Sequence, residues 1–144
     1  AGNGSGLVDP DYDYTWFPEI AACAADAYQQ AGITDPAARI AMAEVHDCFT
    51  IAELLTYEAM GLAPAGQGHR LLEDGTVLRS GRLPVNASGG LKAKGHPIGA
   101  TGVSAMQLMG EAGDLQVPAA TLAGVFNMGG SAVANYVSIL ERAR

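Results

Sequence analysis

Three short segments contain residue types that could carry chemistry. They are His46-Asp47-Cys48-Phe49, Gly95-His96-Pro97 and Asn127-Met128-Gly129-Gly130. A histidine exchanges protons near neutral pH, and a cysteine acts as nucleophile or base once it is a thiolate. Glycines allow a backbone to approach a ligand closely. These residue types together predict proton transfer beside a bound small molecule.

Two of these segments stand just before an expected helix N-terminus. Thr50-x-x-Glu53 has the pattern of a capping box, so a helix is expected directly after Cys48. A second helix is expected at about 99–112, soon after His96. The positive end of a helix favours thiolate and disfavours imidazolium. We therefore expect a lowered pKa for the Cys48 thiol and a neutral ring for His96.

Taken singly, the same residues have simpler structural explanations. A cysteine after a strand is more often a small buried side chain than a base, and Gly-rich segments mostly form turns. Cys23 lies in an expected core helix and His69 in a loop, so neither is assigned a chemical role. No metal site is expected, because the histidines lack ligand spacing and the sequence has no Cys-x-x-Cys motif.

Helical periodicity predicts two helices before residue 65. The first begins near Pro18 and ends at Gly32, and the second begins at Thr50 and ends at Gly61. Residues 33–39 between them are expected to form a loop. The residues of the second helix that should face the core are Ile51, Leu54, Leu55 and Ala59.

Apolar runs predict strands between and after these helices. Strands are expected at 40–45, 119–126 and 131–140, with a small hairpin over 71–78. The order of elements predicts an α/β fold with a mixed five-stranded sheet and helices packed on it. We expect an irregular lead-in at 1–15 and one domain at 16–144.

The composition indicates a globular, acidic protein. The chain has 144 residues, of which 49% are hydrophobic, and its net charge is −7. This charge argues against a nucleic-acid partner, although a few local donors can still bind an anionic small molecule. With two cysteines, no visible secretory signal and no apolar run of membrane-spanning length, we expect a reduced, cytoplasmic protein without a membrane span.

In their order along the chain, the motifs resemble thiolases of the sterol-carrier-protein type. The segments are HDCF at 46–49, TxxELLTYEAxGL at 50–62, NxSGGLxxKGHPxGATG at 86–102, GEAGxxQVP at 110–118 and NMGGSAVANYV at 127–137. The resemblance implies the C-terminal half of a thiolase, which is the second copy of a duplicated βαβαβαββ unit. It also implies acyl exchange with coenzyme A that cleaves or forms 3-ketoacyl-CoA.

The resemblance assigns roles to single residues. His96 would activate the family's nucleophilic cysteine and help polarise the thioester oxygen. His46 would help form an oxyanion hole, and Cys48 would be the second acid/base thiol. The positions expected to bind substrate or coenzyme A, or to support the oxyanion, are Asn86, Gly95, Gly129 and Gly130.

The family's nucleophilic cysteine lies in the first copy of the unit, which this chain lacks. The resemblance therefore implies an N-terminal thiolase half in the same chain or in a partner. It also implies acyl-CoA as substrate, no bound cofactor, and a dimer when complete, so the isolated 144 residues are expected to be inactive. Two alternatives stay open, a carbon–carbon lyase acting by retro-aldol cleavage on acyl-CoA or steroid side chains, and a non-catalytic partner module.

Overall fold

A computed structural model of the protein describes residues 2–3, 10–104, 122–130 and 133–141. The elements are β1 (Gly2–Asn3), α1 (Pro18–Ala31), α2 (Pro36–Arg39), β2 (Ile40–Glu44), α3 (Thr50–Ala59), α4 (Arg70–Glu73), α5 (Gly90–Lys94), β3 (Leu122–Gly129) and β4 (Ala134–Glu141). Residues 101–104 are also helical and begin the helix expected at 99–112. The rest of that helix, and the start of the strand expected at 119–126, lie outside the described residues.

The described strands form one mixed sheet in the order β1-β4-β3-β2. β2 runs parallel to β3, whereas β4 is antiparallel to both β3 and β1. The mixed α/β architecture is confirmed, but the described part of the chain has four strands rather than five. The hairpin expected at 71–78 is wrong. Its first arm lies in α4. The turn expected after it does form, because Asp74 accepts a bond from the N–H of Thr76 at 2.9 Å.

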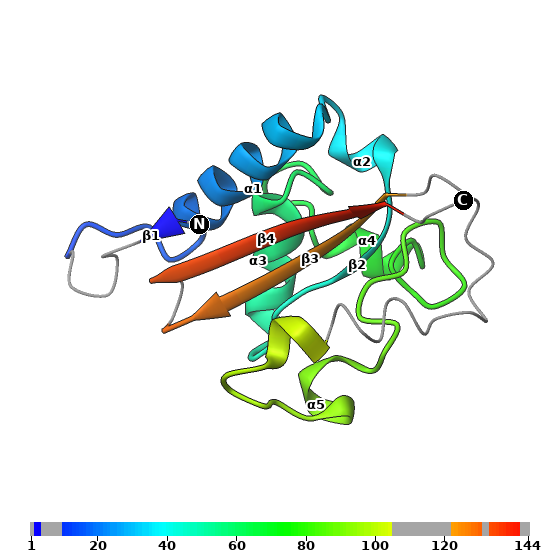
Figure 1. Ribbon diagram of the computed structural model, residues 1–144. Coiled ribbons are helices and arrows are strands. Elements are labelled where there is room, and N and C mark those ends of the chain that lie inside the picture. The colour runs from blue at the N-terminus through cyan, green and yellow to red at the C-terminus, as the bar shows by residue number, and fades with distance from the viewer. Residues whose placement is uncertain (1, 4–9, 105–121, 131–132, 142–144) are drawn as a thin grey trace.

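Helices α1 and α3 cover the sheet and enclose the core (Figure 1). α1 begins at Pro18 and ends at Gly32, whose φ of 66° is the left-handed cap that the sequence predicted. The largest fully buried apolar side chains are Tyr57, Ile20, Ile40, Met60, Leu83 and Val125. Among the described residues, no helix is both long enough and apolar enough to cross a membrane.

Helix α3 begins at the expected residue but not with the expected cap. Its N-cap is Phe49, and no side chain caps the helix. Glu53 does not complete a capping box, because its carboxylate accepts bonds from the Tyr57 hydroxyl at 2.7 Å and the Asn86 amide at 3.0 Å. Ile51 is 58% exposed, so its expected place in the core is wrong. The residues of α3 that are buried are Ala52, Thr56, Tyr57 and Ala59.

The loop expected at 33–39 contains the short helix α2. Pro36 stands at its start, and the carboxylate of Asp35 accepts a bond from the N–H of Ala38 at 3.0 Å. This N-cap fixes the approach of the chain to β2. The sequence prediction overlooked the Asp-Pro pair as a helix start.

The free edge of β2 is occupied by residues 84–86. Ala43 donates to the carbonyl of Pro84 at 2.9 Å, and its own carbonyl accepts from Asn86 at 2.9 Å. β2 is therefore held between β3 and this segment. The segment leads into α5, which lies at the end of the sheet where β2 and β3 terminate (Figure 1). Such strand ends are where α/β folds place their sites.

Replacement of Tyr28 by Phe should destabilise the protein by about 1 kcal/mol. The buried Tyr28 hydroxyl donates to the Met60 carbonyl at 2.8 Å and so ties α1 to the end of α3. The free energy of unfolding would be measured by urea denaturation. The matched control is Tyr136→Phe, because Tyr136 is 55% exposed, and its change should stay within about 0.5 kcal/mol. Equal effects of the two variants would contradict the prediction.

Candidate active site

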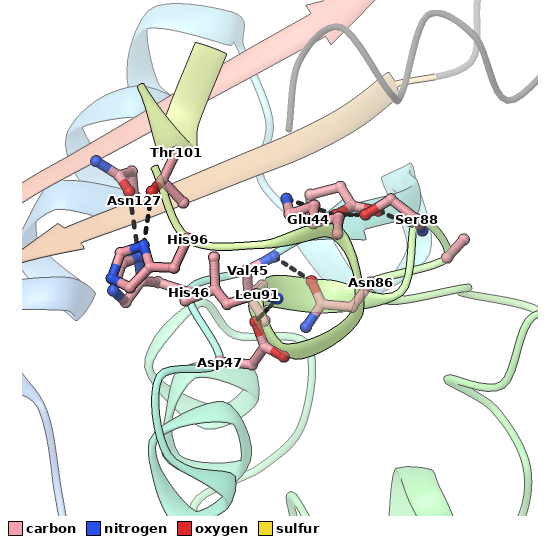
Figure 2. A network of polar contacts seen from close by, with 12 residues as sticks. Glu44, Val45, His46, Asp47, Asn86, Ser88, Leu91, His96, Thr101 and Asn127 are labelled. Atoms are coloured by element: carbon pink, nitrogen blue, oxygen red, sulfur yellow. Dashed lines mark hydrogen bonds and ion pairs between the residues drawn. The ribbon is translucent and has the colours of Figure 1, made fainter. Parts of the chain in front are cut away.

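Two histidines that are fifty residues apart in the sequence meet at the end of the sheet. His46 follows β2 and is buried, whereas His96 follows α5 and is exposed. Their ring centroids are 5.0 Å apart, and the rings meet edge to face at 77° (Figure 2). The structure thus brings together two of the three residues predicted to be catalytic.

Strand pairing places His46 beside Asn127. In the parallel ladder Glu44 lies opposite Val125, so continuing the register by two residues brings His46 to Asn127. The Nδ1 atom of His46 lies 3.2 Å from the Oδ1 atom of Asn127. With Oδ1 facing the ring, Nδ1 carries the proton and the Nε2 atom of the neutral ring has the free lone pair. With the amide turned by 180°, Nδ2 would donate to Nδ1 and the proton would lie on Nε2.

Burial decides the charge state of His46. Loss of water lowers its pKa from the usual value of 6.5, the Asn127 bond partly offsets this, and the neighbouring His96 lowers it further. The ring is therefore neutral at pH 7. A neutral imidazole in this place acts through hydrogen bonds and not as a fixed positive charge.

A threonine orients His96 by a similar logic. The buried Thr101 hydroxyl donates to the Pro97 carbonyl at 3.0 Å, and its oxygen lies 2.8 Å from the Nδ1 atom of His96. Because the single hydroxyl proton is used, His96 must be the donor in the second contact. The Nε2 atom of a neutral His96 then faces outward with a free lone pair, as a general base requires.

Cys48 lies two residues beyond His46, at the start of α3. Two peptide units keep its Cα atom within about 7 Å of that of His46, and its side chain is exposed. That the thiol shares one site with the two histidines stays a prediction. The expected lowering of the thiol pKa is wrong. Removal of water raises the pKa of Cys48 and Asp47 adds to the rise, while the backbone N–H bonds at the helix start lower it by less. Cys48 is therefore a protonated thiol at neutral pH.

Asn86 directs both ends of its amide at protein partners. Its Oδ1 atom accepts from the N–H of Val45 at 2.8 Å, and its Nδ2 atom donates to Glu53 at 3.0 Å. Asn86 has a left-handed φ of 52°, which asparagine tolerates better than most residues. In this structure it holds the backbone just before His46.

The three glycines predicted at the site lie in different settings. Gly95 ends α5 with a φ of 96° and turns the chain into His96. Gly129 is the last residue of β3 and pairs with Ala134, while Gly130 begins the following turn with a φ of 57°. The segment from Asn127 to Gly129 is thus strand, not the turn that the sequence predicted. That these glycines contact substrate stays a prediction.

Sequence reasoning missed the residues that orient the two histidines. Thr101 follows Pro97 by four residues, and this one-turn spacing was an available signal for its bond to the Pro97 carbonyl. Asn127 had been noted only as part of a turn, and its contact with His46 needed the sheet register. Within the described ranges, no group of three or more His, Cys, Asp or Glu side chains is arranged to hold a metal ion.

Comparison with known proteins gives consistent matches. The family described as "Thiolase C-terminal domain-like" matches residues 7–142. Human sterol carrier protein 2 is 48% identical over 107 residues, which are 71% of this chain and 19% of the human protein. An acetyl-CoA acetyltransferase of Methanothermobacter thermautotrophicus is 41% identical over 135 residues, which are 90% of this chain and 35% of that enzyme.

A solved structure adds a second kind of relative. The Ltp2-ChsH2(DUF35) aldolase superposes with a TM-score of 0.70 at 25% identity, over 98% of this chain and 37% of the aldolase chain. In all three pairwise comparisons this chain spans well under half of the matched protein.

Replacement of Asn127 by Asp should raise the pKa of His46 above that of the unaltered protein. A carboxylate 3.2 Å from Nδ1 would favour the imidazolium form, whereas the present amide offsets only part of the burial effect. The ring signals of all histidines would be followed by NMR between pH 4 and pH 9, with exposed His69 as the internal control. An unshifted His46 titration would show that the contact does not exist.

Cys48 should be alkylated slowly at neutral pH. Only the thiolate reacts with iodoacetamide, so its rate should rise with a midpoint above pH 9.0, the ordinary value for a cysteine thiol. Mass spectrometry of the Cys48 peptide would give the rate at each pH. Buried Cys23 should stay unlabelled, and Cys48→Ser should remove the signal. A midpoint below pH 9.0 would contradict the assignment.

Proposed function

The chain belongs to the thiolase C-terminal domain-like family, and from this premise we propose that it is the C-terminal part of an acyl-CoA C-acyltransferase that cleaves or forms 3-ketoacyl-CoA. The observation that carries the proposal is the pair of histidine rings 5.0 Å apart, each anchored through Nδ1. Two anchored imidazoles suit a reaction that moves protons and develops charge on an oxygen. The name of the archaeal acetyltransferase supports the same reaction class.

His96 is the base in this proposal. Its Nε2 atom would take the proton of the family's nucleophilic cysteine, which then attacks the thioester or ketone carbon. The bond to Thr101 supports this role because it keeps the proton on Nδ1 and the lone pair on Nε2. The exposure of His96 leaves that atom accessible to a partner group.

His46 would support the oxyanion. Donation from its Nε2 atom to an oxyanion requires a proton on that atom. Rotation of the Asn127 carboxamide by 180° would supply it, because Nδ2 would then donate to Nδ1 of His46. The lowered pKa of His46 keeps the ring neutral, so it would stabilise the oxyanion as a dipole.

Cys48 is the acid in the cleavage direction. Its raised pKa means that a proton is present on sulfur at neutral pH. That proton would pass to the carbanion released when the carbon–carbon bond of a 3-ketoacyl-CoA breaks. In the synthetic direction the thiolate would remove the same proton, so one residue serves both directions.

A complete enzyme needs the half of the thiolase that supplies the nucleophile, in the same chain or in a partner. Large exposed apolar side chains follow each histidine in the sequence, with Phe49 at 71% after His46, and Ile98 at 90% and Val103 at 65% after His96. Exposed apolar groups next to a site favour a covering partner. We propose that the first half of the thiolase covers them, and that the complete protein is a dimer that takes acyl-CoA as its substrate.

A second candidate is a carbon–carbon lyase acting by retro-aldol cleavage. It is supported by the aldolase that shares this fold at a TM-score of 0.70. The presence of His46, Cys48 and His96 together favours thiolysis. A cysteine nucleophile in the first half would support the thiolase, and its absence would support the lyase.

Thiolysis by the full-length gene product should depend on both Cys48 and His96. Removal of a general acid or base should slow turnover of acetoacetyl-CoA with coenzyme A on the order of 100-fold or more in Cys48→Ala and in His96→Ala. The exposed residue His69 provides a control, and His69→Ala should keep full activity. Intact mass after incubation with acetyl-CoA should show a covalent acyl adduct. A folded protein without adduct or turnover would contradict the thiolase and lead to retro-aldol substrates.

A further inference from the structure

An ion pair is buried beside the histidines. Glu44 is the last residue of β2 and Lys94 is the last residue of α5, and the Nζ and Oε2 atoms are 3.4 Å apart. Their side chains are only 2% and 7% exposed. Burial of two charges takes both out of water, so such a pair is seldom more stable than an apolar pair of equal volume. Stability alone does not account for it, whereas a geometric role does.

The carboxylate of Glu44 binds both ends of one short segment. Its Oε1 atom accepts from the N–H of Ser88 at 3.0 Å, and its Oε2 atom accepts from the Ser88 hydroxyl at 2.5 Å as well as from Lys94 (Figure 2). Ser88 precedes α5 and Lys94 ends it. One buried group therefore closes residues 88–94 into a loop of fixed shape.

A second carboxylate holds the middle of the same segment. The Oδ1 atom of Asp47 accepts from the N–H of Leu91 at 2.9 Å. Gly90 lies so close that a Cβ atom there would be 2.2 Å from Asp47, and its φ is 61°. Glu44 and Asp47 stand on either side of His46 in the sequence. Residues on both sides of His46 thus bind the segment 88–94, which leads to His96.

We propose that Glu44 and Lys94 are positioning residues that fix His96 against His46. His96 follows Lys94 by two residues, so the ion pair that fixes the position of Lys94 also restricts the position of the His96 imidazole. Lys94 can only donate hydrogen bonds and Glu44 can only accept them. The pair therefore fixes one packing arrangement of residues 88–94 on β2, whereas two apolar side chains would allow several. The inference deepens the proposed function, since the pair it positions is the pair assigned to proton transfer.

The test compares Glu44→Gln, Lys94→Met and the double variant Glu44→Gln/Lys94→Met with Lys92→Met. Lys92 is exposed on the same helix and is the matched control. Proximity of the two histidine rings would be read from NOE cross-peaks between them, and stability from the midpoint of thermal unfolding. Neither readout requires catalysis, so a failure of the proposed function would leave this test intact.

We expect Lys92→Met to change neither readout. Lys94→Met should lower the melting temperature, because Glu44 is left as an unpaired buried charge, and should abolish the cross-peaks. The double variant should regain stability without regaining the cross-peaks. Cross-peaks that persist in Lys94→Met, or that return together with stability in the double variant, would overturn the proposal.

The full-length gene product offers a kinetic counterpart. Displacement of a catalytic group by about 1 Å can slow a reaction on the order of 100-fold. Lys94→Met should therefore reduce kcat for thiolysis while KM stays within about twofold, because both side chains of the pair are buried. A rise in KM with unchanged kcat would place Lys94 in substrate binding and would overturn the positioning role.

Discussion

The parallel pairing of β2 with β3 is the constraint on which the site depends. The ladder contains an irregularity between Ile40 and Met42, so that one residue of β2 has no partner on β3. Because side chains alternate along a strand, a shift of one residue exchanges the two faces. Without the shift, Val45 would continue the ladder to Asn127. With it, the histidine takes that place and its Nδ1 atom meets the carboxamide.

Around this ladder, the site is assembled from polar side chains that bind backbone. Three side-chain oxygens each accept a hydrogen bond from a backbone N–H. Asn86 accepts from Val45, Glu44 accepts from Ser88, and Asp47 accepts from Leu91. Buried backbone groups need partners, and these loops have too little regular structure to satisfy one another. The carboxylates and the amide therefore replace a sheet ladder as the scaffold. This explains how an irregular segment can hold a histidine in one place.

Local signals allowed correct prediction of some elements, and non-local pairing decided the others. Helix α1 begins at Pro18 and is capped by Gly32 as expected, because helix-terminating signals depend on residues at the helix ends themselves. The predicted capping box does not form, because the Glu53 carboxylate accepts a hydrogen bond from Asn86, which is thirty-three residues away in the sequence. β3 extends through Gly129 because the whole strand pairs with β4, and this pairing overrides the turn preference of its glycines. The hairpin was wrong because Leu71 and Leu72 lie in the short helix α4, whereas the turn expected at Asp74 does form.

The site shows the same division between residue type and environment. The residues that could do chemistry were visible from their types, and the motif order gave the family. The helix field around Cys48 was read with the right sign, yet the partial loss of water around the thiol outweighs it, and this loss depends on the folded structure. The tautomers depend on Thr101 and Asn127, which fold onto the rings from two different elements. Residue types thus indicate the candidate groups, whereas the position of each ring proton depends on the three-dimensional contact made by Nδ1.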